Sequence, residues 1–427
     1  MKTKSNTDPR SHIVQVITKI YLDGMTTTSG GNISLLDEEG NMWITPSAID
    51  KGKLTAEDIV CVKKDGSIEG KHKPSSEYPF HRAIYEARPD IKSVIHAHPP
   101  ALVTFSILRQ IPDTSILPHA KEVCGSIGYA DYALPGSNLL GEKIAQSFAA
   151  TEDMAVIMEN HGVVLGGADL SDAYARFEML ENCCDIILKA KAIGSPNFLS
   201  EEKISQLKAQ KQLAVNTAAS SPSEAVEIKA EVVEFILRAN RQKLISGSFG
   251  AISVRTASNN FITTPSGIPF WMIEESDLVE IVNGEVLGNQ LPSDVAVLHQ
   301  ETFIENPDIN VIISAQSPNL MAFASTARKF DVRTIPESWI FLQDVPCLSF
   351  EAAFSGNNTL ASTFAEDTPA VLVANHSFTV TGKTILQTFD RLEVAEFSAK
   401  SLVAGAHMGD LVPIGDEHIE DLREKFL

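Results

Sequence analysis

A pair of histidines separated by one residue is the first sign of chemistry in this sequence. His96 and His98 follow the apolar run 93–95 and stand directly before Pro99-Pro100. On a strand, residues i and i+2 point to the same face about 6–7 Å apart, so both imidazoles could close on one divalent ion. The alternative is two histidines at a strand end that only meet water.

Two other residues could complete such a site or work beside it. Glu77 follows Pro74-Ser75-Ser76 and opens a segment that we predict to be helical. An acid at a helix start is often only a partner of the helix dipole, so Glu77 is either structural or an acid–base group. His161, between Asn160 and Gly162 after the apolar run 155–158, is either a third ligand or a turn residue.

Two short polar segments could hold an anion. Gly30-Gly31-Asn32 and Thr45-Pro46-Ser47 offer backbone N–H groups and short polar side chains. Such tripeptides are more often ordinary turns. On their own they assign no ligand.

The chain contains an internal repeat, and a repeat decides the architecture. Four blocks recur in the same order, at offsets that drift from 219 to 215 residues: 44–50 matches 263–269, 73–98 matches 291–316, 159–167 matches 374–382, and 175–181 matches 390–396. Between the copies, residues 200–223 change from charged to small and polar, which is typical of a terminal helix followed by a linker. We therefore predict two domains, 1–207 and 224–427, joined by a linker at 208–223.

The second copy keeps the framework of the first but not its chemistry. Pro292, Ser293 and His299 match residues of the first copy, whereas the acid and the histidine pair are exchanged together. The exchanges are Glu77 to Val295, His96 to Ser314 and His98 to Gln316. The simplest interpretation is one metal site, present in the first copy and dismantled in the second. His376, the counterpart of His161, is then a survivor without its co-ligands.

Hydrophobic patterning places these residues on a mixture of helices and strands. Apolar residues spaced as on one face of an amphipathic helix occupy 13–21, and Gly24 ends that helix. Strands are predicted at 41–45, 58–62, 92–98 and 154–160, and helices at 77–87 and 171–190. Because strictly alternating βαβ units are absent, we predict an α/β fold with a mixed sheet covered by helices.

Composition and charge exclude several classes of protein. The 427 residues are 44 % hydrophobic and 21 % charged, as in ordinary globular proteins. A net charge of −20 without a basic stripe repels polyanions, so we expect no nucleic acid partner. We find no bilayer-spanning apolar run and no signal-peptide core, and the five cysteines have no repeated spacing. We expect a cytoplasmic protein without a membrane partner.

Five motifs of the first copy occur in a specific order and spacing: GGNIS, ITPSAID, KPSSEYPFHRAIY, RPDIKSVIHAHPP and ENHGVVLG. In these motifs, residues 12–190 resemble the class II aldolase/adducin family, and residues 225–405 resemble a divergent member of the same family. The resemblance implies two tandem three-layer α/β/α domains, each with a mixed, largely antiparallel central sheet.

The resemblance also implies roles for particular residues. It implies a zinc ion held by His96, His98 and His161, with Glu77 as the acid–base carboxylate. Four residues fall at the phosphate-binding positions of the family: Asn32, Ser47, Ser75 and Ser76. Ala48 stands where the family usually has glycine. No secure counterpart is found for the tyrosines that the aldolases use.

We therefore expect a metal-dependent lyase, most simply an aldolase that cleaves a phosphorylated ketose through a zinc-stabilised enediolate. The alternatives are a sugar-phosphate dehydratase, a decarboxylase or an epimerase of the same family, a non-catalytic adducin-like interaction protein, and an unrelated metal-assisted hydrolase. Glu77 disfavours the epimerase, whose members usually carry aspartate there. Since catalytic members are commonly fourfold tetramers, we expect a homodimer that brings four domains together.

Overall fold

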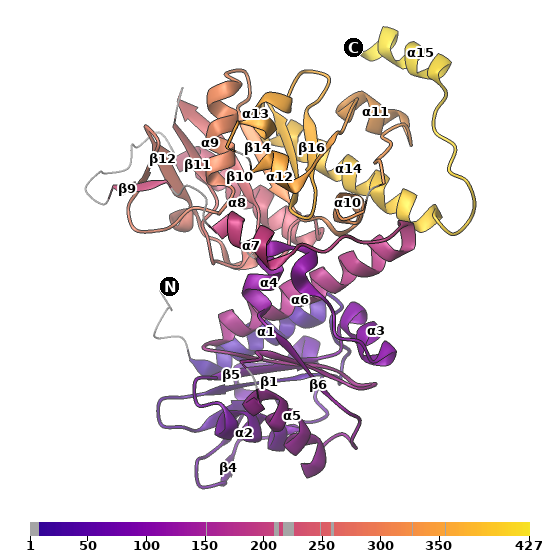
Figure 1. Ribbon diagram of the computed structural model, residues 1–427. Coiled ribbons are helices and arrows are strands. Elements are labelled where there is room, and N and C mark those ends of the chain that lie inside the picture. The colour runs from indigo at the N-terminus through magenta and orange to yellow at the C-terminus, as the bar shows by residue number, and fades with distance from the viewer. Residues whose placement is uncertain are drawn as a thin grey trace. The chain divides into compact units, whose positions relative to one another are not determined.

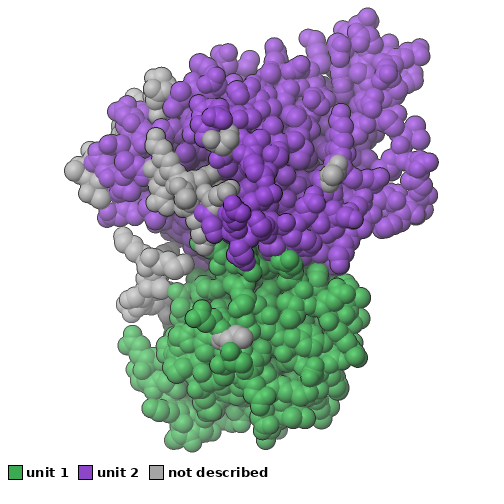
Figure 2. Space-filling model, in the orientation of Figure 1, with its two compact units in different colours: residues 1–114, 120–185 green, residues 115–119, 186–427 purple. Residues whose placement is uncertain are grey.

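The computed structural model describes residues 8–427 except 151, 209–212, 217–225, 248, 258–259, 327 and 355. The chain forms two compact units, one of residues 1–114 and 120–185, the other of residues 115–119 and 186–427 (Figure 2). Most of the linker predicted at 208–223 lies outside the described residues, so the boundary between the copies stays a prediction. Within that range, Ala214–Asn216 forms a strand of the second unit's sheet.

The first unit is an eight-stranded sheet with helices packed on it (Figure 1). Its strands are β1 (Asn32–Leu36), β2 (Met42–Ile44), β3 (Val60–Val62), β4 (Ile68–Glu69), β5 (Ser93–Ala97), β6 (Ile127–Ala130), β7 (Ala155–Met158) and β8 (Gly162–Gly167). Its helices are α1 (Pro9–Leu22), α2 (Tyr78–Ala87), α3 (Pro100–Leu108), α4 (Pro118–Cys124, from residue 120), α5 (Asn138–Ala150) and α6 (Leu170–Ile193, up to residue 185).

The order of this sheet is β4-β3-β2-β1-β5-β8-β7-β6, and every pair of neighbours is antiparallel except β6 and β7. Helices α2 and α5 cover one face, and α1, α3 and α6 lie on the other (Figure 1). The predicted three-layer α/β/α fold with a mixed, largely antiparallel sheet is confirmed.

Helix α1 illustrates how the sequence forms these elements. Asp8 precedes the helix and accepts a hydrogen bond from the Arg10 N–H, and Pro9 stands at the first helical position, where its missing N–H costs nothing. The predicted apolar face is fully buried, at Ile13, Val16, Ile17 and Ile20. Gly24 follows the helix end with a φ of 72°, as predicted for its role as a stop.

The second unit repeats the layout in a nine-stranded sheet. Its strands are β9 (Ala214–Asn216), β10 (Ala251–Ala257), β11 (Asn260–Thr263), β12 (Val279–Val282), β13 (Glu285–Leu287), β14 (Val311–Ala315), β15 (Cys347–Leu348), β16 (Ala370–Val373) and β17 (Ser377–Gly382). Its helices are α7 (Glu201–Lys208), α8 (Val226–Arg241), α9 (Ala296–Glu305), α10 (Pro318–Ala324), α11 (Pro336–Leu342), α12 (Phe350–Ala353), α13 (Thr359–Thr363), α14 (Ile385–Gly405) and α15 (Asp416–Phe426).

The two sheets share one order of eight strands, to which the second sheet adds β9. The strands β4-β3-β2-β1-β5-β8-β7-β6 of the first unit correspond to β13-β12-β11-β10-β14-β17-β16-β15 of the second. In the first unit Asn32 lies opposite His96, and in the second Ala251 lies opposite Ser314. The second sheet is also antiparallel except at β15–β16 and β13–β9. Each side chain of one repeat can therefore be compared with its counterpart in the other.

Among the described residues, no helix combines the length and the apolar character needed to cross a membrane.

Candidate metal centre

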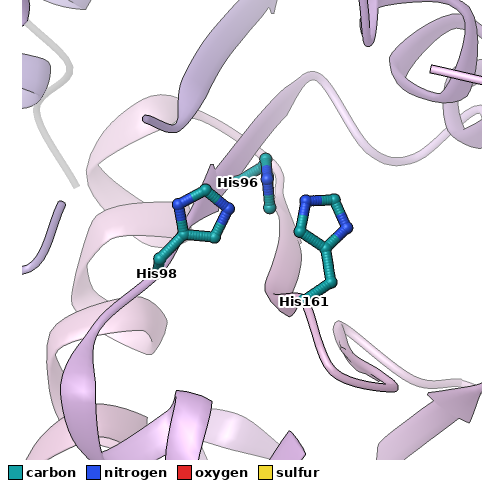
Figure 3. Close-up of side chains that lie close together, drawn as sticks. All are labelled: His96, His98 and His161. Atoms are coloured by element: carbon teal, nitrogen blue, oxygen red, sulfur yellow. The ribbon is translucent and has the colours of Figure 1, made fainter. Parts of the chain in front are cut away.

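The three predicted histidines come together from two neighbouring strands of the first sheet. His96 lies on β5, His98 follows one residue after the end of that strand, and His161 lies in the tight turn between β7 and β8. The three rings face a common point (Figure 3). Their centroids are 4.7 Å apart for His96 and His98, 4.8 Å for His96 and His161, and 5.3 Å for His98 and His161.

The free ring nitrogens of this cluster have the character of metal ligands. His96 donates from Nδ1 to the carbonyl oxygen of Val163 at 2.9 Å, which leaves Nε2 directed at the cluster. His96 Nε2 and His98 Nε2 are buried and make no hydrogen bond to any described residue, and His161 presents its Nε2 beside them, near Glu77. One nitrogen of each histidine lies within 4.8 Å of those of the others. Orphaned buried acceptors are costly, so this arrangement fits a divalent ion.

Burial keeps the imidazoles neutral, which is the protonation state that binds metals. Burial and then the neighbouring histidines lower the pKa of His96 well below its ordinary value. Burial and His161 lower the pKa of His98 to about 4. Burial also lowers the pKa of His161, against a smaller opposing effect of Glu77. At neutral pH none of the three rings carries a charge that would repel a cation.

Close approach of the backbone at the cluster requires glycine. A Cβ on Gly30 would lie 3.0 Å from His98 Nδ1, and a Cβ on Gly162 would lie 2.6 Å from the carbonyl oxygen of Ala97. Glycine is therefore favoured at positions 30 and 162, because a Cβ would come too close to these atoms.

Glu77 immediately precedes α2 but does not cap that helix with its side chain. Its carboxylate accepts a hydrogen bond from Asn32 Nδ2 at 2.8 Å and lies 3.4 Å from His96 Nε2 and 3.5 Å from His161 Nε2. The side chain is 12 % exposed. Of the two interpretations that the sequence left open, the contacts favour a group that works at the histidine cluster.

A buried chain of hydrogen bonds, which the sequence analysis missed, holds Asn32 in place. His81 on α2 donates from Nε2 to Asn32 Oδ1, and its Nδ1 accepts from the Ser34 hydroxyl at 2.7 Å. Since Asn32 Oδ1 can only accept, the ring must carry its proton on Nε2. The Asn32 amide is therefore oriented with its N–H toward Glu77. Ser253 and His299 of the second copy match Ser34 and His81. This retained pair was the signal in the sequence that Ser34 and His81 belong together.

The four predicted phosphate-binding residues lie on three segments that are hydrogen-bonded to one another. Thr45 N–H donates to the carbonyl oxygen of Ile33, next to Asn32. Ser47 N–H donates to Lys73 O, and Ser75 N–H donates to Thr45 O, with a bridge between Pro46 and Pro74. Ser75 is buried and Ser76 is exposed at the start of α2. The pairing brings the backbones of Asn32, Ser47, Ser75 and Ser76 into one region, and their role toward phosphate stays a prediction.

Ala48 adopts a left-handed conformation, with a φ of 57°, and its counterpart Gly267 has a φ of 74°. A residue with a Cβ is disfavoured in this conformation.

We expect Ala48→Gly to raise the free energy of unfolding by about 0.5–1 kcal/mol, since relief of this strain outweighs the added freedom of the unfolded chain. Urea-induced unfolding measures the change. Ala87→Gly, at the end of α2, is the control and should lower stability; a loss at position 48 as well would contradict the prediction.

In the second unit, a network of hydroxyl groups stands where the first has its histidine cluster. Ser314, the counterpart of His96, hydrogen-bonds to His299 Nε2 and to Thr379 Oγ1, both at 2.8 Å. Gln316, the counterpart of His98, donates from Nε2 to the carbonyl oxygen of His376 at 2.8 Å. Ser314 and the Gln316 amide N–H therefore have protein partners at the positions that correspond to two of the histidines.

Aromatic rings enclose the surviving histidine. Phe249, at the position of Gly30, lies 5.2 Å from the His376 ring centroid, and Phe354 lies 4.6 Å away. Burial lowers the pKa of His376 to about 3. Among the described residues, the only cluster able to hold a metal ion is His96, His98 and His161.

Comparison with known proteins identifies the family. The model of the class II aldolase and adducin N-terminal domain matches residues 11–188 and, a second time, residues 230–403. The chain belongs to the class II aldolase and adducin family. The double match confirms the resemblance drawn from the motifs and the tandem duplication of this class II aldolase-family chain.

The three relatives named here each match less than half of the chain. The 5-deoxy-D-ribulose 1-phosphate aldolase of Bacillus thuringiensis is 33 % identical over 205 residues, 46 % of this chain and 92 % of the relative. The L-fuculose phosphate aldolase of Methanococcus maripaludis is 34 % identical over 177 residues, 41 % and 94 % of the two chains. The 3-oxo-tetronate 4-phosphate decarboxylase of Haemophilus influenzae is 31 % identical over 173 residues, 40 % and 81 %.

Solved structures of the same family also match. An L-fuculose 1-phosphate aldolase is 31 % identical, with 47 % of this chain and 94 % of the other covered and a TM-score of 0.42. Together, the family and its sequence relatives support an enzyme of the lyase class.

Proposed function

We propose that the first repeat is a zinc-dependent carbon–carbon lyase that cleaves a phosphorylated ketose in the manner of an aldolase. The observation that carries this proposal is the position of Glu77, whose carboxylate faces two imidazoles of the histidine cluster instead of capping its helix. A metal ion held there would supply a Lewis acid for carbon–carbon cleavage, and an adjacent carboxylate can move the proton that the reaction transfers.

Each residue of the site has a distinct part in this proposal. His96, His98 and His161 would hold the ion, which supplies a Lewis acid for the substrate's carbonyl and hydroxyl oxygens. Glu77 takes a proton from the substrate and returns it, while Asn32 holds one carboxylate oxygen. The phosphate would be bound by Asn32, Ser47, Ser75 and Ser76.

Decarboxylation of a phosphorylated 3-oxo acid is the second candidate. The similarity to a 3-oxo-tetronate 4-phosphate decarboxylase covers about as much of this chain as the similarity to the aldolases. Both reactions leave negative charge on the carbon next to a carbonyl, so the same cluster serves both. For the second repeat, the enclosed His376 supports a structural role.

Dihydroxyacetone phosphate in deuterated water tests the proposal without knowledge of the aldehyde product. An aldolase exchanges one proton of the hydroxymethyl carbon, which nuclear magnetic resonance detects, and it cleaves at least one ketose 1-phosphate. We expect exchange that depends on added metal. Release of carbon dioxide from 3-oxo-tetronate 4-phosphate without exchange would support the decarboxylase instead, and inactivity with all phosphorylated substrates would reject both.

We also propose that two chains form a dimer with four aldolase-like domains. Closed twofold symmetry is the commonest arrangement of homo-oligomers, and a metal-free repeat that keeps its sheet intact is suited to a structural part in such an assembly. Light scattering should give twice the mass of one chain. A fully active monomer would contradict this prediction.

A further inference from the structure

Lys51 is a buried lysine in the first unit with no carboxylate partner among the described residues. Its side chain is 1 % exposed. The Nζ donates one hydrogen bond, to the carbonyl oxygen of Pro46 at 2.9 Å. Lysine is almost never fully buried unless it is paired, so this position needs a reason.

The lysine contacts the backbone of the loop that carries Ser47. Its N–H donates to the carbonyl oxygen of Thr28 at 2.9 Å, and its ammonium reaches the peptide between Pro46 and Ser47. The same loop pairs with the segment that ends in Ser75. Lys51 therefore contacts the backbone of the region that holds the predicted phosphate-binding residues.

The second repeat shows that the fold does not require a charge here. Phe270 is the counterpart of Lys51 and is also fully buried. Its N–H donates to the carbonyl oxygen of Gly247, as Lys51 N–H does to that of Thr28, and both residues open a short 3-10 helix. Where the metal ligands are gone, a phenyl ring fills the same place.

A buried ammonium without a counter-ion is unfavourable, so an anion bound near Lys51 would relieve this cost. Burial lowers the pKa of Lys51 to about 8, so the side chain still carries its charge at neutral pH. A phosphate dianion bound on the other side of the loop would balance that charge through a region of low dielectric, where attraction is strong.

We propose that Lys51 is a positioning residue that selects substrates carrying a phosphate group, by placing a fixed positive charge behind the loop of Pro46 and Ser47. The lysine does not touch the substrate. Its charge acts through the loop, whose shape its hydrogen bond to Pro46 also maintains. This inference rests on the proposed function, in which the substrate is phosphorylated.

The test uses the metal-loaded full chain with Lys51→Met and Lys51→Gln, the second of which can still donate a hydrogen bond. Inorganic phosphate is the probe, measured by calorimetry at constant ionic strength. We expect both variants to bind phosphate about tenfold or more weakly, with unchanged metal content and undiminished thermal stability. Lys53→Met, which removes an exposed lysine two residues away, should change phosphate binding little.

Kinetic measurements distinguish selection of phosphorylated substrates by Lys51 from a purely structural role of this residue. The KM for a phosphorylated ketose should rise by a similar factor with kcat nearly unchanged, while turnover of the unphosphorylated ketose stays the same. Equal losses on both substrates, unchanged phosphate binding, or failure of both variants to fold would overturn the inference.

The outcomes also separate this inference from the proposed lyase activity. If the wild-type chain binds phosphate and the variants do not, yet no ketose phosphate is cleaved, the lyase proposal fails and the role of Lys51 stands. If the wild-type chain does not bind phosphate, the role of Lys51 is rejected whatever the reaction.

Discussion

Replacing His96 or His98 with alanine is expected to remove the bound metal ion and all turnover. The wild-type chain should hold about one ion, because the described residues contain a single cluster of suitable ligands. Loss of one imidazole from a three-histidine site leaves too few donors to retain the ion against water. Elemental analysis of the purified chain measures the metal, and activity on a ketose phosphate measures the consequence.

His376→Ala is the matched control, since it removes the counterpart of His161 from a position enclosed by Phe249 and Phe354. Its metal content should equal that of the wild type. Should alanine at position 96 prevent folding, His96→Ser and His98→Gln repeat exchanges that the second copy already tolerates. Two ions per chain, or one ion that survives the loss of His96 and disappears with His376, would contradict the asymmetry.

Glu77→Gln is expected to lower the turnover rate by about 10²–10⁴-fold while the metal stays bound. Glutamine keeps the length of the side chain and can still accept the hydrogen bond from Asn32 Nδ2. It cannot take up a proton, so the step that needs a base is lost. The measurements are kcat on a ketose phosphate and deuterium exchange into dihydroxyacetone phosphate, each with metal analysis of the same sample.

Glu86→Gln is the control for this prediction. Glu86 lies on the same helix, α2, and is exposed, so its neutralisation changes the charge of the helix without touching the site. Its activity should match that of the wild type. An unchanged rate for Glu77→Gln would mean that Glu77 is only an acid near a helix start.

The candidate site was predictable because the repeat provides an internal comparison. His96, His98 and Glu77 differ between the copies, whereas residues such as Pro292 and His299 do not, and this contrast separates chemistry from framework within a single sequence. The mixed sheet covered by helices followed from apolar spacing, and its three layers from the resemblance. The conformation of Ala48 also follows from its match with Gly267.

Other features depend on contacts that spacing does not encode. The orientation of Asn32 by His81 requires β1 to lie beside β5, which places Asn32 opposite His96. Whether Glu77 caps its helix or turns toward the histidines depends on side-chain rotation alone. The burial of Lys51 could not be read from a segment, KGKL, that looks exposed by composition.

The enclosed position in the second repeat has a consequence for how such a copy can evolve. A histidine restored at Ser314 or Gln316 alone would break hydrogen bonds to His299, Thr379 or His376 and still lack its partners. Phe249, at the position of Gly30, packs against His376. Each single substitution is therefore expected to lower the stability of the fold without creating a metal site. A metal site at these positions would therefore require several substitutions at once.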